Sequence, residues 1–390
     1  MKYLILGAAL VAAAGLHAQN HMVVSAYNYM TDRNFEKAVE FIEPAITNEA
    51  TANKEKTWRY RGNIYAQIAL GTDEALKAKF PDALKKSAES LIKAKELDAK
   101  GSYKDENNQL LQNLQIAALN GGNDAFTAKD YDKAIADYNE SEAIAKALGR
   151  VDTNAVFNSA LAYESKGDLD MAMQRYQQCI DIGYNKPDVY RYLASMKKRK
   201  GDLDGAIATT KQGVARFPDN KELRLDEVAF LLEADKMGEA EASVKDAIKN
   251  DPENPVLYSV LGSLYDGKAN PKEGEVSEQD MLKWYGLAEE AYQQSIKVDP
   301  NFFDSYYNIG VLYNNRAAYE YDKCNQIKDE KQYLACKTEA DKIYQKTIPY
   351  FEKAHELKPE DRAAMQQLKV IYAKTGDEAK YNAIKKELGE

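Results

Sequence analysis

The chain repeats one pattern of apolar, small and polar positions about every 34 residues, most clearly between Pro187 and Asn254. Aligned on Tyr190 and Arg224, two consecutive segments match without an insertion at Leu193/Glu227, Ala194/Val228, Leu203/Met237, Ala206/Ala240, Val214/Ile248 and Pro218/Pro252. Small residues recur where two helices must approach closely, and a proline closes each segment where a second helix must stop. The pattern therefore predicts a helical hairpin as the repeating unit.

Further copies of the pattern cover the rest of the chain after Ala18. Their first helices are marked by Ala26 and Tyr29, by Trp58, Gly62 and Tyr65, by Ala160 and Tyr163, by Tyr258, Leu261, Gly262 and Tyr265, and by Ile309, Gly310 and Tyr313. The register is least clear between residues 103 and 128, because Gly121 and Gly122 could kink or end a long helix there.

The copies near the C-terminus differ in length. The closing pattern of the eighth unit, Phe351, Ala354 and Pro359, arrives about 25 residues late, so we expect both helices of that unit to be extended. The segment from Arg362 to Leu388 is typical of a polar-faced closing unit.

These residues resemble the tetratricopeptide repeat family, whose signature is Trp-x2-Leu-Gly-x2-Tyr, then Ala-x3-Phe, then Pro. The resemblance extends over nearly all of the chain after Ala18. It implies an all-α fold, a right-handed superhelical solenoid of about nine helix-turn-helix repeats with a concave groove. We expect residues 19–150 to form N-terminal repeats with longer helices, and residues 151–390 to form C-terminal repeats with two inserted or extended hairpins and a closing helix pair.

The segment at residues 1–18 has the layout of a secretory signal peptide. Lys2 supplies a positive end, residues 3–11 form an apolar run, and residues 12–18 are rich in alanine before Gln19. The run is too short for a transmembrane helix, although a retained N-terminal anchor is an alternative interpretation. We expect an exported protein that does not insert into a membrane after cleavage. The periplasm of a Gram-negative bacterium is the simplest location, with the cell surface or secretion as alternatives.

The composition narrows the class of partner. Hydrophobic residues make up 44% of the chain and the formal net charge is −9. Nucleic acids and anionic membrane surfaces attract basic proteins, so neither is expected as the main partner. Proteins, peptides or small ligands remain, and the sequence does not indicate an oligomeric state.

Catalytic and metal-binding motifs are not found in the sequence. The three histidines are His17 in the signal peptide, His21 and His355, and none has a second His or Cys at metal-ligand spacing. Nucleophile-elbow, phosphate-loop, dinucleotide and zinc-protease motifs are also missing. We therefore expect a protein that is not an enzyme and that needs no cofactor or metal.

The three cysteines are expected to differ in role. Cys179 occupies a small-residue position of the repeat and is expected to be a buried free thiol. Cys324 and Cys336 flank a polar turn near residues 328–331, so two antiparallel helices meeting there would bring them face to face. In an oxidising compartment we expect a disulfide that staples the extended hairpin, worth about 3 kcal/mol for a loop of this size.

The resemblance also implies which side chains face the groove, because positions 2, 5, 9 and 12 of each first helix point into it in family members. In this chain these positions include Arg59, Asn63, Asn154, Phe157, Arg191, Lys198, Leu225, Tyr307, Val311 and Asn314. Arg59, Gly62 and Asn63 resemble the first half of a clamp that grips a peptide's terminal carboxylate. Asn154 and Asn158 stand where that clamp has cations, and solvated surface residues are the alternative interpretation of Arg59 and Asn63.

We interpret the sequence as a non-enzymatic scaffold or adaptor of the bacterial cell envelope, which binds an extended peptide or a partner helix in its groove. One alternative is an envelope assembly or secretion-system factor that docks by its convex face and by the inserts at residues 266–276 and 322–332. Another alternative is a small-ligand receptor or an enzyme whose site the sequence conceals.

Overall fold

The computed structural model describes residues 21–271 and 276–390, so the expected signal peptide at residues 1–18 lies outside the described residues. Within these ranges the regular elements are helices and no strand occurs. Contacts divide the chain into two compact units, the first ending at Met196 and the second beginning at Lys197. Each unit has hydrophobic clusters of its own. The change in repeat character expected at residue 150 stays a prediction.

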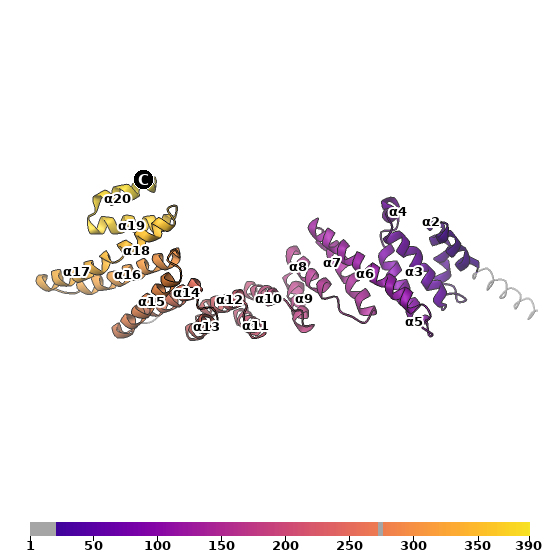
Figure 1. Cartoon of the computed structure of the whole chain (residues 1–390), viewed down its shortest axis with the longest axis horizontal. Helices are drawn as coiled ribbons and strands as arrows, with labels where there is room; N and C mark the ends of the chain where they lie inside the picture. Colours follow the sequence, from indigo (N-terminus) through magenta and orange to yellow (C-terminus); the bar gives the residue numbers. More distant parts are fainter. Residues whose placement is uncertain (1–20, 272–275) are drawn as a thin grey trace, which may run out of the picture. The chain divides into compact units, whose positions relative to one another are not determined.

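Unit 1 consists of consecutive helical hairpins, each with a first and a second helix (Figure 1). A short helix, α4 (Glu74–Lys79), lies in the long turn of the second hairpin. In chain order the paired helices are residues 21–31 with α2 (Phe35–Ile42), α3 (Glu55–Ala69) with α5 (Ala83–Leu97), α6 (Lys104–Thr127) with α7 (Tyr131–Ala147), and α8 (Thr153–Lys166) with α9 (Leu169–Asp181), followed by α10 (Asp188–Arg199), in which the division falls.

Unit 2 continues the same arrangement of helices. Its elements are α11 (Leu203–Arg216), α12 (Lys221–Glu233) with α13 (Met237–Asn250), α14 (Pro255–Ala269) with α15 (Glu278–Val298), α16 (Phe303–Cys324), α17 (Glu330–Gln345), α18 (Ile348–Leu357), and α19 (Arg362–Thr375) with α20 (Glu378–Glu387). Apart from α10 and α11, which lie on either side of the division, the described residues hold eight hairpins, and the repeat pattern predicts about nine units.

The eighth hairpin differs from the expectation that both of its helices are extended. The first helix, α16, is long, but the extra residues after it form a separate helix, α17, and α18 then packs on α16 as the second helix. Pro349 explains the break, because proline is tolerated in the first turn of a helix and cannot continue one. The late arrival of Phe351 in the sequence therefore reflects an inserted helix.

Short turns with a left-handed residue join the two helices of several hairpins. Gly167 and Gly201 have φ values of 89° and 83°, a conformation that glycine adopts without steric cost. The aspartate that follows each of them, Asp168 or Asp202, accepts a hydrogen bond from a backbone N–H of the next helix and so caps it. The Gly-Asp dipeptide therefore ends one helix and starts its partner.

In four hairpins the two helices approach each other closely at a glycine of the first helix. A Cβ atom placed on Gly262 would lie 2.6 Å from Cδ1 of Tyr292 in α15, and one placed on Gly310 would lie 2.7 Å from Cζ of Phe351 in α18. Gly62 against Leu91 and Gly122 against Tyr138 repeat this contact in unit 1. Because of this contact, the glycine pair at residues 121–122 does not end a helix, and α6 continues to Thr127.

A tyrosine three residues after this glycine joins its hairpin to the preceding one. Its hydroxyl donates a hydrogen bond to a glutamate in the preceding second helix or at its C-terminal cap. The pairs, with their oxygen–oxygen distances, are Tyr65 and Glu43 at 2.8 Å, Tyr265 and Glu241 at 3.1 Å, and Tyr313 and Glu289 at 2.5 Å. The Gly-x-x-Tyr motif therefore controls packing within a hairpin and bonding between hairpins.

We expect Gly262→Ala to lower the free energy of unfolding by about 1–3 kcal/mol, because the new methyl group would overlap the ring of Tyr292. Gly286→Ala is the matched control, since Gly286 is exposed in the interior of α15 and has no neighbour within 4 Å of an added Cβ. At Gly286 the same change should raise the free energy of unfolding by as much as about 1 kcal/mol, because alanine has the higher helix propensity. Urea midpoints followed by circular dichroism test both, and equal midpoints would contradict the close-approach argument.

Among these glutamates, Glu241 is bonded to the largest number of side chains. Lys245 and Tyr265 donate to it at 2.7 Å and 3.1 Å, and Lys268 of α14 forms a further ion pair with it. Burial alone would raise the pKa of Glu241, but the hydrogen bonds from the two lysines and the tyrosine outweigh burial and lower the pKa to about 2. The ionised carboxylate thus links α13 to α14.

A carboxylate with a depressed pKa contributes stability above its ordinary pKa of 4.5 and loses that contribution as the pH falls towards about 2. We therefore expect Glu241→Gln to destabilise unit 2 by about 2 kcal/mol at pH 7, the usual magnitude for a hydrogen bond to a charged group. The difference should shrink between pH 4.5 and pH 2. Urea titrations at several pH values, with exposed Glu253→Gln as control, measure it, and a constant difference would disprove the linkage.

Candidate functional site

A cavity of about 330 Å³ opens on unit 1 where three consecutive first helices lie side by side. The helix of residues 21–31 supplies Met30, α3 supplies Asn63 and Gln67, and α6 supplies the remaining lining residues, Glu106, Gln109, Leu110 and Asn113. Four of these seven side chains are carboxamides. We call this site the amide cavity.

The carboxamides point into the cavity because of helical spacing. Asn63 and Gln67 are four residues apart on α3, and Gln109 and Asn113 are four residues apart on α6, so each pair occupies one helix face. The Oδ1 atom of Asn63 is buried and has no hydrogen-bond partner among the residues that the structure describes. A buried acceptor without a donor costs free energy, which a ligand that donates an N–H or O–H group would recover.

Aromatic side chains and Arg59 form a stack across the same helices, one turn before the residues that line the cavity. The rings of Tyr27 and Tyr60 stack with centroids 4.6 Å apart, and the guanidinium of Arg59 lies 5.0 Å from the Tyr60 centroid and 3.7 Å from that of Tyr103. Arg59 also pairs with Glu55 at 2.6 Å and is 8% exposed. The stack therefore fixes the positions of the three helices, and Arg59 acts mainly as a packing residue.

A second hollow of about 330 Å³ shares Gln109 with the amide cavity. Its other lining residues are Asp105, Asn108, Gln112, Leu148 and Arg150. The Oδ1 atom of Asn108 is also buried without a partner. The polar lining thus extends beyond the amide cavity along α6.

The chemistry of this surface suits a ligand with alternating donors and acceptors. Each carboxamide offers two N–H donors and one carbonyl acceptor, the same groups that a peptide backbone presents in complementary form. Glu106 adds one negative charge, and Met30 and Leu110 add apolar contact area. Amide donors and acceptors beside apolar contact area suit the binding of a polar ligand.

Other residues expected to face the groove in unit 1 have different surroundings. Asn154 is exposed on α8. Phe157 is half-buried, with its ring centroid 5.2 Å from that of Tyr184 and 6.4 Å from that of Tyr192. Arg191 is half-buried and lies 4.0 Å from Asp188. These three residues do not line the amide cavity.

In unit 2 the expected groove residues fall into separate groups. Lys198 pairs with Glu233 at 2.5 Å, and Leu225 is half-buried on α12. Tyr307 packs edge-on against Phe351 with centroids 5.5 Å apart, Val311 belongs to the same apolar cluster, and Asn314 accepts a hydrogen bond from Tyr344 at 2.7 Å. These last three contacts stabilise the eighth hairpin.

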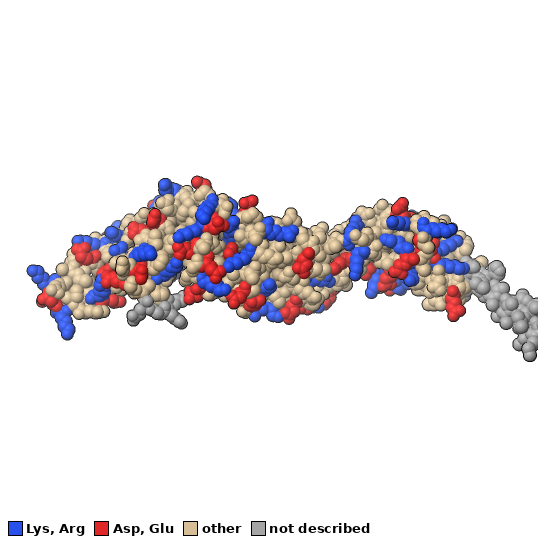
Figure 2. Space-filling view, turned by 90° about the horizontal axis from the view of Figure 1, so that it is seen from below, with Lys and Arg blue, Asp and Glu red and all other residues tan. Residues whose placement is uncertain are grey.

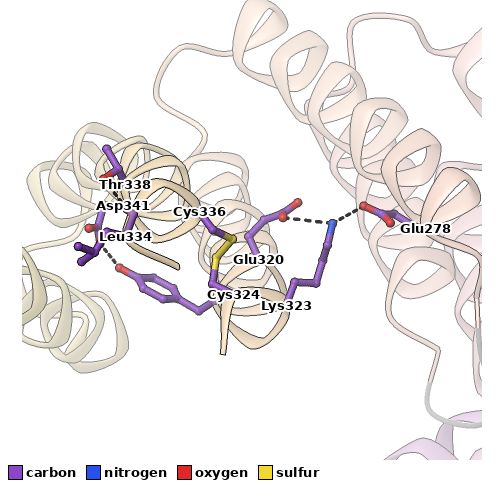
Figure 3. The surroundings of a disulfide bond; sticks show 9 residues. Glu278, Glu320, Lys323, Cys324, Leu334, Cys336, Thr338 and Asp341 are labelled. Atoms are coloured by element: carbon purple, nitrogen blue, oxygen red, sulfur yellow. Dashed lines mark hydrogen bonds and ion pairs between the residues drawn. A yellow bond between two sulfur atoms is a disulfide. The ribbon is translucent and has the colours of Figure 1, made fainter. Parts of the chain in front are cut away.

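A disulfide bond joins Cys324 at the end of α16 to Cys336 in α17, with their Cα atoms 5.6 Å apart (Figure 3). Lys323, beside this bond, reaches Glu278 of α15 at 2.5 Å and Glu320 at 3.5 Å, and Tyr321 donates a hydrogen bond to Asp341. The inserted helix α17 is thus fixed to α16. Cys179 is a buried free cysteine, and burial raises the pKa of its thiol to about 12.

Several properties of the described part of the chain bear on function. None of its helices is long and apolar enough to cross a membrane. Among the same residues, no group of three or more His, Cys, Asp or Glu side chains is placed to hold a metal ion. On the face shown in Figure 2, basic and acidic side chains lie interspersed, so that face carries no broad field of one sign.

Sequence reasoning identified Asn63 but missed Gln67, Glu106, Gln109 and Asn113. A signal for them was present, because amides four residues apart occur twice in the first helices of neighbouring units. The uncertain register between residues 103 and 128 prevented that signal from being used. It also concealed that α6 contributes most of the lining.

Comparison with known proteins gives three matches to family models, all described as tetratricopeptide repeat. They cover residues 153–182, 199–264 and 291–332. Among solved structures, the chain is similar to YrrB, "a TPR protein with an unusual peptide-binding site", with 16% identity over 56% of this chain and 96% of that one and a TM-score of 0.36.

Two other structures show the same level of likeness. The MamA protein is 20% identical over 53% of this chain and 92% of its own, with a TM-score of 0.37. TTC0263, a thermophilic TPR protein in Thermus thermophilus, is 17% identical over 51% and 98%, with a TM-score of 0.30. The matched residues lie in consecutive helices of the structure, and the chain contains repeats of the tetratricopeptide repeat family.

Proposed function

We propose that this chain, a protein–protein interaction scaffold, binds an extended peptide segment in the amide cavity of unit 1. The observation that carries the proposal is the buried Oδ1 atom of Asn63, which has no donor in a cavity lined by three further carboxamides. An extended peptide supplies backbone N–H and C=O groups that fit such a surface. Recognition of this kind depends on the peptide's backbone more than on its sequence.

The spacing of the helices supports an extended ligand. Packed helices lie about 8–10 Å apart, and an extended chain advances about 3.3 Å per residue. Amides on α3 and α6 would therefore meet the backbone of one ligand about every third residue. Glu106 favours a lysine or arginine in the segment, and Met30 and Leu110 favour a neighbouring apolar residue.

We also propose that the scaffold works outside the cytoplasm, in the periplasm of a Gram-negative bacterium. Two features support this location: the signal-peptide layout of residues 1–18 and the bond between Cys324 and Cys336, since disulfides persist in oxidising compartments. The proposed role is non-enzymatic. Docking through the α16–α17 hairpin is the rival role, because Leu334 of α17 is 54% exposed.

Photo-crosslinking identifies the ligand and the surface that binds it. A benzoylphenylalanine is placed at Gln109 in the amide cavity, at Leu334 on the inserted helix, or at Val370, an exposed apolar position on α19 that serves as control. We expect the Gln109 variant to crosslink a defined polypeptide segment in the cell envelope. Capture from Leu334 in place of Gln109 would support docking by the inserted hairpin and reject the cavity.

Calorimetry with the captured segment as a synthetic peptide then tests Asn63. Asn63→Leu removes the acceptor and should weaken binding about tenfold or more, the effect of losing one hydrogen bond to a buried group. Asn154→Leu is the matched control, because Asn154 is an exposed amide on α8 outside the cavity lining. Equal affinities for wild type and Asn63→Leu would rule out recognition through this acceptor.

Asn63→Leu should stabilise the protein without its ligand, although it weakens binding. Asn63→Leu abolishes a buried acceptor without a partner and improves helix propensity, so we expect the urea midpoint to rise by the equivalent of about 1 kcal/mol. Asn154→Leu should change it by less than about 0.5 kcal/mol. A fall in stability for Asn63→Leu would mean that Asn63 has a structural role.

A further inference from the structure

The sixth hairpin has charged residues at two positions that are tyrosine and leucine in its neighbours. In its first helix, α12, Arg224 and Glu227 take the positions that Tyr258 and Leu261 hold one repeat later in α14. Tyrosine and leucine at these positions are apolar packing residues, whereas Arg224 and Glu227 carry charges. A charged pair at core positions is costly unless it serves another purpose.

The break leaves two hollows, one on each side of Arg224. The larger, about 450 Å³, lies between α11 and α13, with α12 packed against both helices. It is lined by Lys211, Val214, Ala215, Arg224, Glu227, Glu239, Ala242, Ser243 and Asp246. We call it the α12 cavity. The smaller, about 240 Å³, has Arg224, Lys221, Asn250 and Leu257 among its lining residues.

The charges around the α12 cavity are paired except for one carboxylate. Lys211 of α11 lies 2.6 Å from Glu239 of α13, and Arg224 lies 2.9 Å from Asp246 of α13. Glu227 is 8% exposed and forms no ion pair with the residues that the structure describes. Three carboxylates therefore face two cations, which leaves the cavity with one uncompensated negative charge when Glu227 is ionised.

The environment of Glu227 is that of a binding group without its counter-ion. Burial raises the pKa of its carboxyl group, and a hydrogen bond with Ser243 and the positive charges of Lys211 and Arg224 offset the rise in part. Val214, Ala215 and Ala242 add small apolar side chains to the walls. The cavity thus combines an acidic group with partly apolar walls.

We propose that the α12 cavity binds an alkyl cation, an ammonium or guanidinium group on an aliphatic stem, with Glu227 as its counter-ion. The stem would contact Ala215 and Ala242, and the cation would pair with the carboxylate of Glu227. An anionic guest would meet the net negative charge, and a purely apolar guest would leave Glu227 without an ion pair. The cation can come from a lysine or arginine side chain of a partner polypeptide or from a free diamine.

Alanine methyl NMR of the full chain tests the proposal directly. The probes are 1,5-diaminopentane, the capped tripeptide Gly-Lys-Gly and its uncharged analogue Gly-norleucine-Gly. We expect the two amines to shift the Ala215 and Ala242 methyl signals in a saturable way and the norleucine peptide to leave them unchanged. Saturation by the diamine alone would assign the site to small amines, and saturation by the lysine peptide would assign it to a polypeptide.

Variants separate the binding role of Glu227 from a structural one. Glu227→Gln keeps the shape and removes the charge, so amine affinity should fall about tenfold or more, while the exposed Glu222→Gln on the same helix should retain it. Glu227→Leu restores the apolar residue found in α14, and we expect it to abolish binding and raise the thermal midpoint. A higher midpoint shows that the loss of binding is not a loss of folding.

The pH dependence has a defined sign. Because the pKa of Glu227 is raised above 4.5, its carboxylate ionises at a higher pH than that of an ordinary glutamate. Amine binding should therefore strengthen as the pH rises through the pKa of Glu227. The other titratable groups facing it, Lys211, Glu239 and Asp246, are in ion pairs. Amine binding that is the same in Glu227→Gln, or that the norleucine peptide reproduces, would overturn the proposal.

Discussion

The close approach of two helices at a glycine is the contact on which four of the hairpins depend. Gly62, Gly262 and Gly310 allow a large side chain of the second helix to lie against the backbone of the first, where a methyl group would not fit. The tyrosine three residues later then bonds to a glutamate of the preceding second helix. In these three hairpins a single short motif therefore determines both the packing inside the hairpin and the bond to its neighbour.

The tyrosine–glutamate bonds depend on the protonation states of their two groups. Burial, followed by the nearby glutamate, raises the pKa of Tyr65 and Tyr313, so their hydroxyls stay protonated and can donate throughout the physiological range. Glu241 shows the complementary effect, since its several donors keep it ionised even in acid. Each tyrosine–glutamate bond joins a neutral donor to a charged acceptor, and such hydrogen bonds are stronger than those between neutral groups.

The fold could be read from the sequence because its signals are local. The regular repeat spacing, the glycines and the closing prolines predict hairpins without knowledge of long-range contacts. The surroundings of individual side chains were less predictable. Arg59 and Asn63 lie one turn apart on α3, yet Tyr103 of the next hairpin covers Arg59 while Asn63 lines a cavity. That difference depends on how neighbouring hairpins pack, which the pattern of one repeat does not contain.

The alignment of the repeats also concealed a site by treating a mismatch as a match. Glu227 was paired with Leu193 because the spacing agreed, although a carboxylate and an isobutyl group cannot fill the same core position. In repeat proteins each unit contacts mainly its neighbours, so a departure from the pattern affects stability locally and can persist. The residues that disagree with the repeat are therefore the first place to look for binding chemistry. Asn63, which lies beside the glycine of a regular hairpin, shows that such chemistry can also be added without disturbing the motif.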